Sequence, residues 1–531
     1  MTRPTPLRPV PPRPALLALV GCAVLVFGAC TADPEATAPR GGPPTSLSEP
    51  GPPASSAADP AADPALAAFY GQAPAWRDCG DDGLQCTEVT VPVDWDAPAA
   101  GSIELAVVRA PATDTDARRG SLLVNPGGPG GSGVEYVTAG AESAASAAVR
   151  AAYDLVGFDP RGVGASEPVD CLSDAEMDAY LAFTADPETP RGLAAATAEA
   201  ERFAAGCAAD AGDLLGNLDT ISVARDLDVL RAVLGDDHLS YLGYSYGTLI
   251  GAEYAELFPQ RVGRVVLDGA IDPALTLDDV SLGQAVGMEG ALRAYVAACV
   301  AGESGGECPL RGTVEQGLAQ VGGVLQAAQE RPLRTDSGRE VTGSLALLGV
   351  IRPLYDDASW FALDEALAGA LNGDGTRLLE LADSYAERRP DGTYASNLLE
   401  VFNAVNCLDY PADDDPASMA QRAARIETAA PTVGPYFGYG DVVCGAWDAP
   451  AVREPRPVRA AGAAPILVVG TTGDPATPYE WARSLADQLE SGRLLTFEGE
   501  GHTAYQRSEC ITAAVDGYLV DGVLPGKDAT C

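Results

Sequence analysis

Short apolar runs recur along the first half of the chain, and most of them are followed by glycine or aspartate. Residues 87–93 alternate between apolar and polar positions, and residues 103–108 follow after a polar turn, which predicts two antiparallel strands. Four more apolar runs are separated by helical patterns, at residues 121–124, 153–158, 239–242 and 262–267. Strands that alternate with helices are typical of a mostly parallel sheet with helices on both faces.

The pattern changes after residue 274. Residues 275–455 contain amphipathic stretches such as 314–329 and no strong strand run, and the strand signals resume only at 465–470 and 493–497. The sequence therefore predicts an eight-stranded type of α/β sheet, interrupted before its last two strands by a large, mainly helical cap. Such an insertion lies above the carboxyl ends of the strands, where open sheets carry their sites. An independent helical domain is the alternative.

The first 29 residues have the pattern of an export signal. Three arginines precede an apolar run at residues 15–29, which is too short to span a bilayer as an ordinary helix. The run ends in Phe-Gly-Ala-Cys, which resembles a bacterial lipobox and predicts a lipid on Cys30; Cys22 and ordinary secretion are the alternatives. Residues 30–64 are rich in proline, alanine, glycine and aspartate, which predicts a disordered tether outside the cytoplasm.

The rest of the chain is predicted to form three segments, an α/β part at 65–274, the cap at 275–455 and a second α/β part at 456–531. The formal net charge of −41 argues against nucleic acid and against attraction to anionic lipid, so only the N-terminal lipid is expected to reach the membrane. Ten cysteines follow Cys30 without Cys-x-x-Cys or zinc-type spacing, which predicts neither a metal site nor a cofactor.

One serine lies between a predicted strand and a predicted helix. Ser245 is the centre of Gly-Tyr-Ser-Tyr-Gly, in the strand–turn–helix context of a nucleophile elbow. Ser304 fits the same pattern, but no strand precedes it, and we expect a turn residue there. A serine nucleophile needs a base, and the chain contains only two histidines. His238 precedes the serine, whereas an elbow requires a later histidine, which predicts His502 as the base.

An aspartate is expected to orient this histidine. Asp474 follows the run at 465–470, one strand before His502, and would hold the imidazole in the correct tautomer. Asp268 and Asp272, after an earlier strand, are the rival acids, and a helix-capping role is the alternative for Asp474.

Two backbone N–H groups are expected to stabilise the oxyanion of the acylation intermediate. One belongs to Tyr246, the residue after the nucleophile, and the other to Gly128, in the glycine run at 125–131 after the third strand. This run lacks the Gly-x-x-x-x-Gly-Lys pattern, so a nucleotide site is not predicted.

Three motifs together resemble the tripeptidyl and prolyl aminopeptidase branch of the α/β-hydrolases. They are Asn-Pro-Gly-Gly-Pro-Gly from Asn125, Gly-Phe-Asp-Pro-Arg-Gly from Gly157 and Gly-Tyr-Ser-Tyr-Gly-Thr from Gly243. The resemblance runs from about residue 76 to the C-terminus, and the chain is most similar to exported, lipid-anchored serine proteases of Gram-positive bacteria. Asn125 stands where prolyl aminopeptidases usually have histidine, which argues against narrow proline specificity.

The resemblance implies a Ser-His-Asp peptidase that releases tripeptides, other short peptides or single residues from free N-termini, with peptides or proteins as substrates. It also implies a carboxylate that binds the substrate ammonium group. Glu400 and Asp409, late in the cap, are the candidates, and solvated surface charge is the alternative for both. An esterase or lipase on the same triad, and a non-catalytic lipid-anchored binding protein, are the alternative functions.

The resemblance and the even cysteine count of an exported chain together predict five disulfides between neighbours, although spacing alone does not determine the connectivity. The expected pairs are Cys79–Cys86, Cys171–Cys207, Cys299–Cys308, Cys407–Cys444 and Cys510–Cys531.

Overall fold

The structure is a computed structural model that describes residues 60–80 and 83–531. The predicted export signal at 1–29 and the predicted lipidation site at Cys30 lie outside the described residues. Of the predicted tether at 30–64, only the last residues are described, and Pro60–Ala62 form a 3-10 turn. Within the described part of the chain, no helix is both long and apolar enough to traverse a bilayer.

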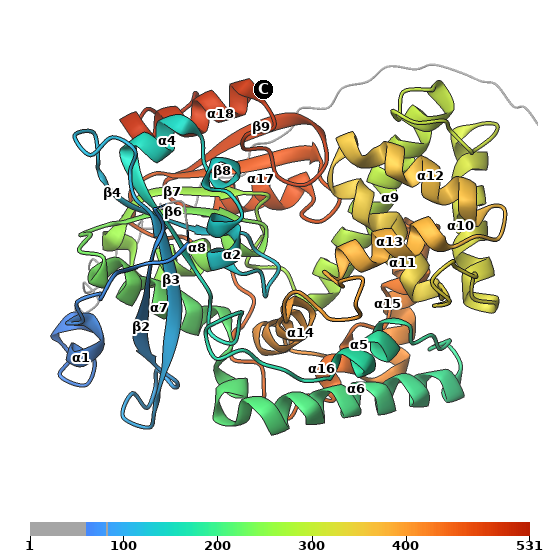
Figure 1. The fold of residues 1–531 in the computed structure, drawn as a ribbon, viewed down its shortest axis with the longest axis horizontal. Helices are drawn as coiled ribbons and strands as arrows, with labels where there is room; N and C mark the ends of the chain where they lie inside the picture. Colours follow the sequence, from blue (N-terminus) through green and yellow to red (C-terminus); the bar gives the residue numbers. More distant parts are fainter. Residues whose placement is uncertain (1–59, 81–82) are drawn as a thin grey trace, which may run out of the picture. The chain divides into compact units, whose positions relative to one another are not determined.

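Ten strands of the described residues form one sheet, in the order β1-β2-β3-β5-β4-β6-β7-β8-β9-β10 (Figure 1). The β1–β2, β2–β3 and β3–β5 pairs are antiparallel, and all later pairs are parallel, which confirms the predicted antiparallel start and mostly parallel sheet. The strands are β1 (Arg77–Asp78), β2 (Gln85–Pro92), β3 (Ser102–Ala110), β4 (Gly120–Asn125), β5 (Tyr153–Phe158), β6 (Leu239–Tyr244), β7 (Val262–Asp268), β8 (Ile466–Gly473), β9 (Gly492–Glu500) and β10 (Ala529–Thr530). The two extra strands relative to the predicted eight are the two-residue edge strands β1 and β10.

Helices cover both faces of the sheet. One face packs on α7 (Thr220–Val233), α8 (Tyr246–Leu257) and α17 (Tyr479–Gln488). The other packs on α2 (Gly133–Thr138), α4 (Ala147–Ala152) and α18 (Glu509–Asp516). Every residue of β4 and β5 is buried, because successive side chains point into the two opposite cores. This double burial explains why these strands appear in the sequence as continuous apolar runs.

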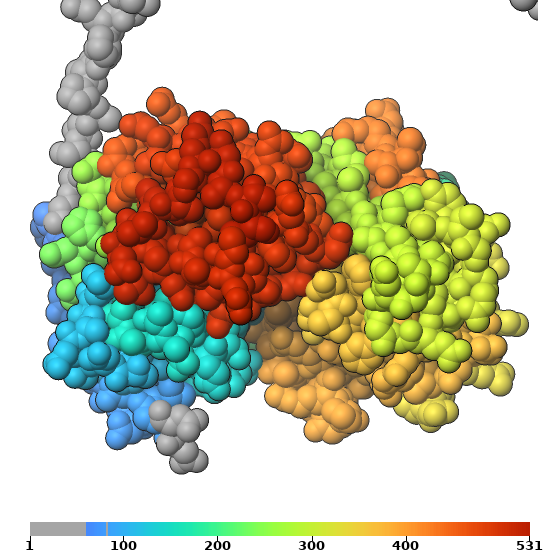
Figure 2. Space-filling view, turned by 90° about the horizontal axis from the view of Figure 1, so that it is seen from above, coloured from blue at the N-terminus to red at the C-terminus, as the bar shows by residue number. Residues whose placement is uncertain are grey.

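The predicted cap is helical and lies between β7 and β8 in the chain. It has its own hydrophobic core, formed mainly by α9 to α13. Its helices are α9 (Leu277–Ala301), α10 (Val314–Glu330), α11 (Gly343–Ile351), α12 (Trp360–Ala370), α13 (Thr376–Tyr385), α14 (Leu398–Asp409), α15 (Pro416–Ala429) and α16 (Asp441–Gly445). In Figure 2 the yellow cap lies against the red C-terminal segment.

Two features of the helical region differ from the simple prediction of one inserted segment. Helix α14 packs into the core of the α/β domain through Val401, Val405 and Leu408 rather than into the cap core. Helix α6 (Pro190–Ala211), which precedes β6 in the chain, packs beside α16 and joins the same side of the molecule (Figure 1). The helical side is therefore built from two separate parts of the chain.

The ten cysteines of the described residues form five disulfides, in the pairs predicted from the sequence: Cys79–Cys86, Cys171–Cys207, Cys299–Cys308, Cys407–Cys444 and Cys510–Cys531. The loops that they close are short, with sequence separations from 7 to 37 residues. Each cross-link restricts the unfolded chain and so stabilises the folded one.

Candidate active site

Ser245 lies at a sharp turn between the end of β6 and the start of α8. Its backbone φ is 53°, in the left-handed region that non-glycine residues rarely occupy. Its N–H donates to the carbonyl oxygen of Asp268, the last residue of the neighbouring strand β7, at 2.9 Å. A strained serine that is held by a neighbouring strand and is only partly buried is the geometry of a nucleophile elbow.

The two glycines of the pentapeptide are required by close backbone contacts. A Cβ atom on Gly243 would lie 2.5 Å from the carbonyl oxygen of Gly247. A Cβ atom on Gly247 would lie 2.8 Å from the backbone oxygen of Asn125. A larger residue at either position would force the turn open, so the Gly-x-Ser-x-Gly pattern follows from the packing of the elbow.

His502 is paired with Asp474. Its Nδ1 atom lies 2.9 Å from both carboxylate oxygens of Asp474, which is buried and also accepts hydrogen bonds from the N–H groups of Ala476 and Thr477. An ionised carboxylate only accepts, so Nδ1 carries the proton and Nε2 is left with its lone pair. Burial by itself lowers the pKa of His502, but the charge and hydrogen bond of Asp474 raise the pKa above its ordinary value.

Gly269 brings the histidine and the elbow to the same strand end. It follows Asp268, whose carbonyl binds the Ser245 N–H, and a Cβ atom on Gly269 would lie 3.2 Å from Cε1 of His502. Cε1 is the ring carbon between the two nitrogens. The residues predicted as nucleophile, acid and base therefore follow β6, β8 and β9, around the carboxyl end of β7.

The rival acids have other partners. The Asp268 carboxylate accepts the N–H groups of Ala504 and Tyr505 at 2.8 to 3.1 Å, so it holds the turn after the histidine rather than the ring. Burial raises the pKa of Asp268 to about 6. Asp272 accepts from the Gln488 side chain at 2.6 Å. Among the residues described, only Asp474 has a carboxylate hydrogen-bonded to the imidazole of His502.

The glycine run after β4 lies directly on the elbow. A Cβ atom on Gly127 would lie 2.9 Å from Cβ of Ser245 and 3.0 Å from the backbone nitrogen of Tyr246. The Gly127 N–H is taken by the side-chain oxygen of Asn125 at 2.9 Å. Within residues 60–80 and 83–531, the N–H groups of Gly128 and Tyr246 have no protein acceptor. Both remain free to donate to an oxyanion beside the serine.

Glu400 lines a cavity of about 550 Å³ next to this loop. The residue is 6% exposed, and burial and the charge of Asp170 raise the pKa of Glu400 to about 7. The cavity is also lined by Glu135, Asp159, Asp170 and Asp174, and among the residues that the structure describes no lysine or arginine lines it. The backbone of Leu398 touches Gly130, so the wall that carries Glu400 begins at the glycine run.

Asp409 does not line this cavity. It is 1% exposed and points toward the α/β domain, where it accepts from the N–H of Thr220 at 2.9 Å and from its hydroxyl at 2.5 Å. The Thr220 hydroxyl is in turn 2.6 Å from the hydroxyl of Tyr246. The structure therefore places Glu400, but not Asp409, in the lining of the cavity next to the glycine run.

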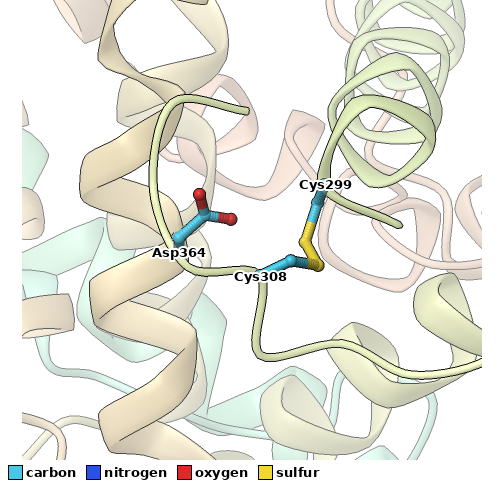
Figure 3. Close-up of side chains that lie close together, drawn as sticks. All are labelled: Cys299, Cys308 and Asp364. Carbon is cyan, nitrogen blue, oxygen red and sulfur yellow. A yellow bond between two sulfur atoms is a disulfide. The ribbon is translucent and has the colours of Figure 1, made fainter. Parts of the chain in front are cut away.

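Ser304 lies in a bend of the loop after α9, as expected for a turn residue, and is buried in the cap. Its hydroxyl donates to Asp364 at 2.6 Å, and Tyr295 donates to the other oxygen of Asp364 at 2.9 Å. Figure 3 shows Asp364 beside the Cys299–Cys308 disulfide. The sulfur atoms are joined to each other, so neither is a thiolate ligand for a metal ion.

The cap touches the histidine directly. The backbone N–H of His502 donates to the carbonyl oxygen of Tyr355 at 2.8 Å. The Tyr355 ring meets the imidazole edge-on, with ring centres 5.4 Å apart. Arg507, five residues after the histidine, forms an ion pair with Asp357 at 2.6 Å. This contact between the cap and the C-terminal segment helps to fix the loop that carries the base.

Sequence reasoning missed Gly127, Gly269 and Tyr355, which support the site. Gly127 stands in the glycine run at 125–131, whereas Gly269 stands in no motif, and the atoms that both approach come from distant parts of the chain. No local pattern marks Tyr355, because its contribution is a backbone carbonyl.

A serine at a strand-to-helix elbow, followed by an acid and then a histidine after later parallel strands, is the arrangement of the α/β-hydrolases. Two family models match the chain in agreement with this geometry. The model of the alpha/beta hydrolase fold matches residues 120–305, and the model of the TAP-like protein matches residues 430–531.

Similar proteins cover most of the chain. Serine protease Hip1 of Mycobacterium tuberculosis is 38% identical over 468 residues, which cover 85% of this chain and 87% of that protein. Carboxylesterase B of the same organism is 38% identical over 458 residues, covering 84% and 86%. Tripeptidyl aminopeptidase of Streptomyces coelicolor is 33% identical over 481 residues, covering 86% and 85%. The chain therefore belongs to the α/β-hydrolase family, among its TAP-like serine hydrolases.

Proposed function

We propose that the protein is an exported serine peptidase that releases tripeptides, or other short peptides, from the free N-termini of peptides. The observation that carries the proposal is the meeting of the Ser245 elbow and the His502–Asp474 pair at the end of β7. The relatives named serine protease and tripeptidyl aminopeptidase support peptide substrates. The relative named carboxylesterase B supports the second candidate, an esterase on the same triad.

In the proposed mechanism, the Ser245 hydroxyl attacks the scissile carbonyl while Nε2 of His502 takes its proton. The N–H groups of Gly128 and Tyr246 stabilise the oxyanion. His502 then gives the proton to the departing amine, which leaves an acyl-enzyme ester on the serine. A water molecule, activated by the same histidine, hydrolyses this ester and restores the serine hydroxyl. Asp474 holds the imidazole and stabilises its cationic form throughout.

The cavity that contains Glu400 is the proposed site of the substrate's ammonium group. Of the described residues, five carboxylates and no lysine or arginine line this cavity, so a positive charge is attracted there. A partly desolvated cation also lowers the pKa of Glu400 from its raised value and so favours the carboxylate that binds it. A free N-terminus would then be recognised by charge, whereas a blocked one would not.

Three substrates and two variants test this proposal: a free tripeptide anilide, its N-acetylated form and a nitrophenyl ester. We expect Glu400→Gln to lower kcat/KM for the free peptide by roughly tenfold or more, with little change for the other two. Glu340→Gln, at an exposed glutamate of the cap, is the matched control and should change none of them. Equal losses of Glu400→Gln on all three substrates would count against ammonium recognition by this residue. Ester turnover without any peptide turnover would favour the esterase.

The location of the enzyme is a separate part of the proposal. Cys30 and most of the predicted tether lie outside the described residues, and their sequence pattern supports a lipid anchor on the outer side of the membrane. Cys30→Ala is expected to release the protein from membranes with unchanged kcat/KM, and Cys22→Ala is the control. Membrane fractionation followed by a peptidase assay measures both. Release by Cys22→Ala instead would move the lipidation site.

A further inference from the structure

A line of buried polar groups connects the helical region to the elbow. Asp409, the last residue of α14, binds Thr220 at the start of α7, and the Thr220 hydroxyl binds the hydroxyl of Tyr246 at the start of α8. All three side chains are buried. None of them touches the cavity of Glu400, and the proposed mechanism uses only the backbone N–H of Tyr246.

The direction of the hydrogen bonds follows from the chemistry of the three groups. An ionised Asp409 accepts only, so the Thr220 hydroxyl donates its single proton to Asp409. The Thr220 oxygen then accepts the proton of the Tyr246 hydroxyl. Burial raises the pKa of Tyr246 well above its ordinary value, which keeps the phenol protonated as this donor. The hydroxyl of Tyr246 on α8 is thus held by Thr220 on α7, which is in turn held by the carboxylate of Asp409 on α14.

Burying the carboxylate of Asp409 costs free energy, so its buried position requires a compensating role. Burial raises the pKa of Asp409 to about 7, although Arg453 and the two bonds from Thr220 lower it. Arg453 is shared, because it also forms an ion pair with Glu253 at 2.8 Å. The Cys407–Cys444 disulfide, two residues before Asp409, fastens this end of α14 to α16.

We propose that Asp409 and Thr220 are positioning residues for the oxyanion hole. They hold the Tyr246 side chain and through it the Tyr246 N–H, next to a serine whose strained backbone needs external support. Backbone donors stabilise an oxyanion only when they are aimed at it in advance, and small misplacements reduce the rate strongly. The inference rests on the proposed function, because it assigns the support of the same site.

The test is Tyr246→Phe, which removes one hydroxyl and leaves the backbone donor in the chain. We expect kcat to fall by roughly ten- to a hundredfold with KM unchanged, equally for the free tripeptide anilide, its acetylated form and the nitrophenyl ester. The matched control is Tyr295→Phe, because Tyr295 also donates to a buried carboxylate, Asp364 in the cap, at 2.9 Å. The control should lower thermal stability without lowering kcat.

A double-mutant cycle shows whether the three groups act as one unit. Asp409→Asn alone should lower kcat in the same way, and adding Asp409→Asn to Tyr246→Phe should cause little further loss. Fully additive losses, a change in KM alone, or an equal kcat loss in Tyr295→Phe would each overturn the inference. An inactive Ser245→Ala together with an unaffected Tyr246→Phe would overturn only this inference. An active Ser245→Ala would overturn the proposed function itself.

Discussion

The chain contains two serines in the pattern Gly-x-Ser-x-Gly, and the structure gives them opposite surroundings. Ser245 follows a parallel strand and starts a helix, with a left-handed backbone and a histidine at the adjoining strand end. Ser304 lies in a loop after α9, and its hydroxyl is tied to a buried carboxylate. The two glycines of the pentapeptide satisfy the packing requirement of a nucleophile elbow. The pentapeptide alone does not make its serine a nucleophile.

The buried aspartates of the two regions sharpen this difference. Asp474 accepts from an imidazole, which moves protons at neutral pH, whereas Asp364 accepts from a tyrosine and a serine, which at neutral pH keep theirs. The same acceptor thus serves proton transfer in one place and packing in the other. Each of the following predictions separates the two regions by a different quantity.

The largest difference is expected in turnover. Ser245→Ala should lower kcat by on the order of 10⁴-fold or more, because it removes the atom that attacks the carbonyl. Ser304→Ala should leave kcat within about twofold in a steady-state assay with the peptide anilide. Reversed effects would mean that the elbow is assigned to the wrong serine.

The aspartates should differ by a smaller but still large factor. Asp474→Asn is expected to lower kcat by about 10³- to 10⁴-fold, because the imidazole loses the partner that sets its tautomer. Asp364→Asn should leave kcat unchanged and shift only the melting temperature. Assays of both purified variants, with circular dichroism as the check on folding, give the comparison. An active Asp474→Asn would return Asp268 to consideration as the acid.

The pH dependence of kcat/KM should report the raised pKa of His502. The base works only when it is neutral, so activity falls about tenfold per pH unit below its pKa, and this acidic limb should lie above the ordinary histidine value of about 6.5. Asp474→Asn removes the negative charge and should move the limb to lower pH. Asp364→Asn should leave it in place. A limb that stays fixed in Asp474→Asn would show that another group titrates.

The smallest expected effects are on stability. Here the substitution of Ser304 should be more harmful than that of Ser245, whereas the reverse is expected for kcat. Ser304→Ala deprives the buried Asp364 of one hydrogen bond and should cost about 1.5–3 kcal/mol. Ser245→Gly relieves the left-handed backbone and should add about 1 kcal/mol to the free energy of unfolding. Urea denaturation at equilibrium measures both. A destabilised Ser245→Gly would show that the elbow stores no strain.

The parts of the molecule that were predictable are those in which a local pattern has one physical meaning. Strands β4 and β5 are buried on both faces and therefore appear as continuous apolar runs, and the motif order places the elbow. The two-residue strands β1 and β10 are too short for any periodicity, and they form only because a neighbouring edge is available. Helix α14 is amphipathic in either environment, so its pattern does not reveal that it packs into the α/β core.

The candidate site divides in the same way. Ser245, Asp474 and His502 stand in a recognisable order. Thr220, which donates two hydrogen bonds to Asp409, is 189 positions away from it, and no sequence period connects the two. Burial of Asp409 depends on where α7 and α8 begin, which only the assembled fold decides. The two candidates for ammonium binding therefore separate in the structure: Glu400 lines the cavity next to the glycine run, whereas Asp409 is buried against Thr220.

The hydrogen bond from the backbone N–H of His502 to the carbonyl of Tyr355 connects the position of the cap to the position of the catalytic base. The loop of the base is anchored to the helical region that stands beside it, and Arg507 fastens the same loop to Asp357. A movement of the cap away from this loop would break both contacts and loosen the base at the same moment. Proton transfer by His502 would then depend on the position of the cap, and hydrolysis would pause until the cap returned to the loop.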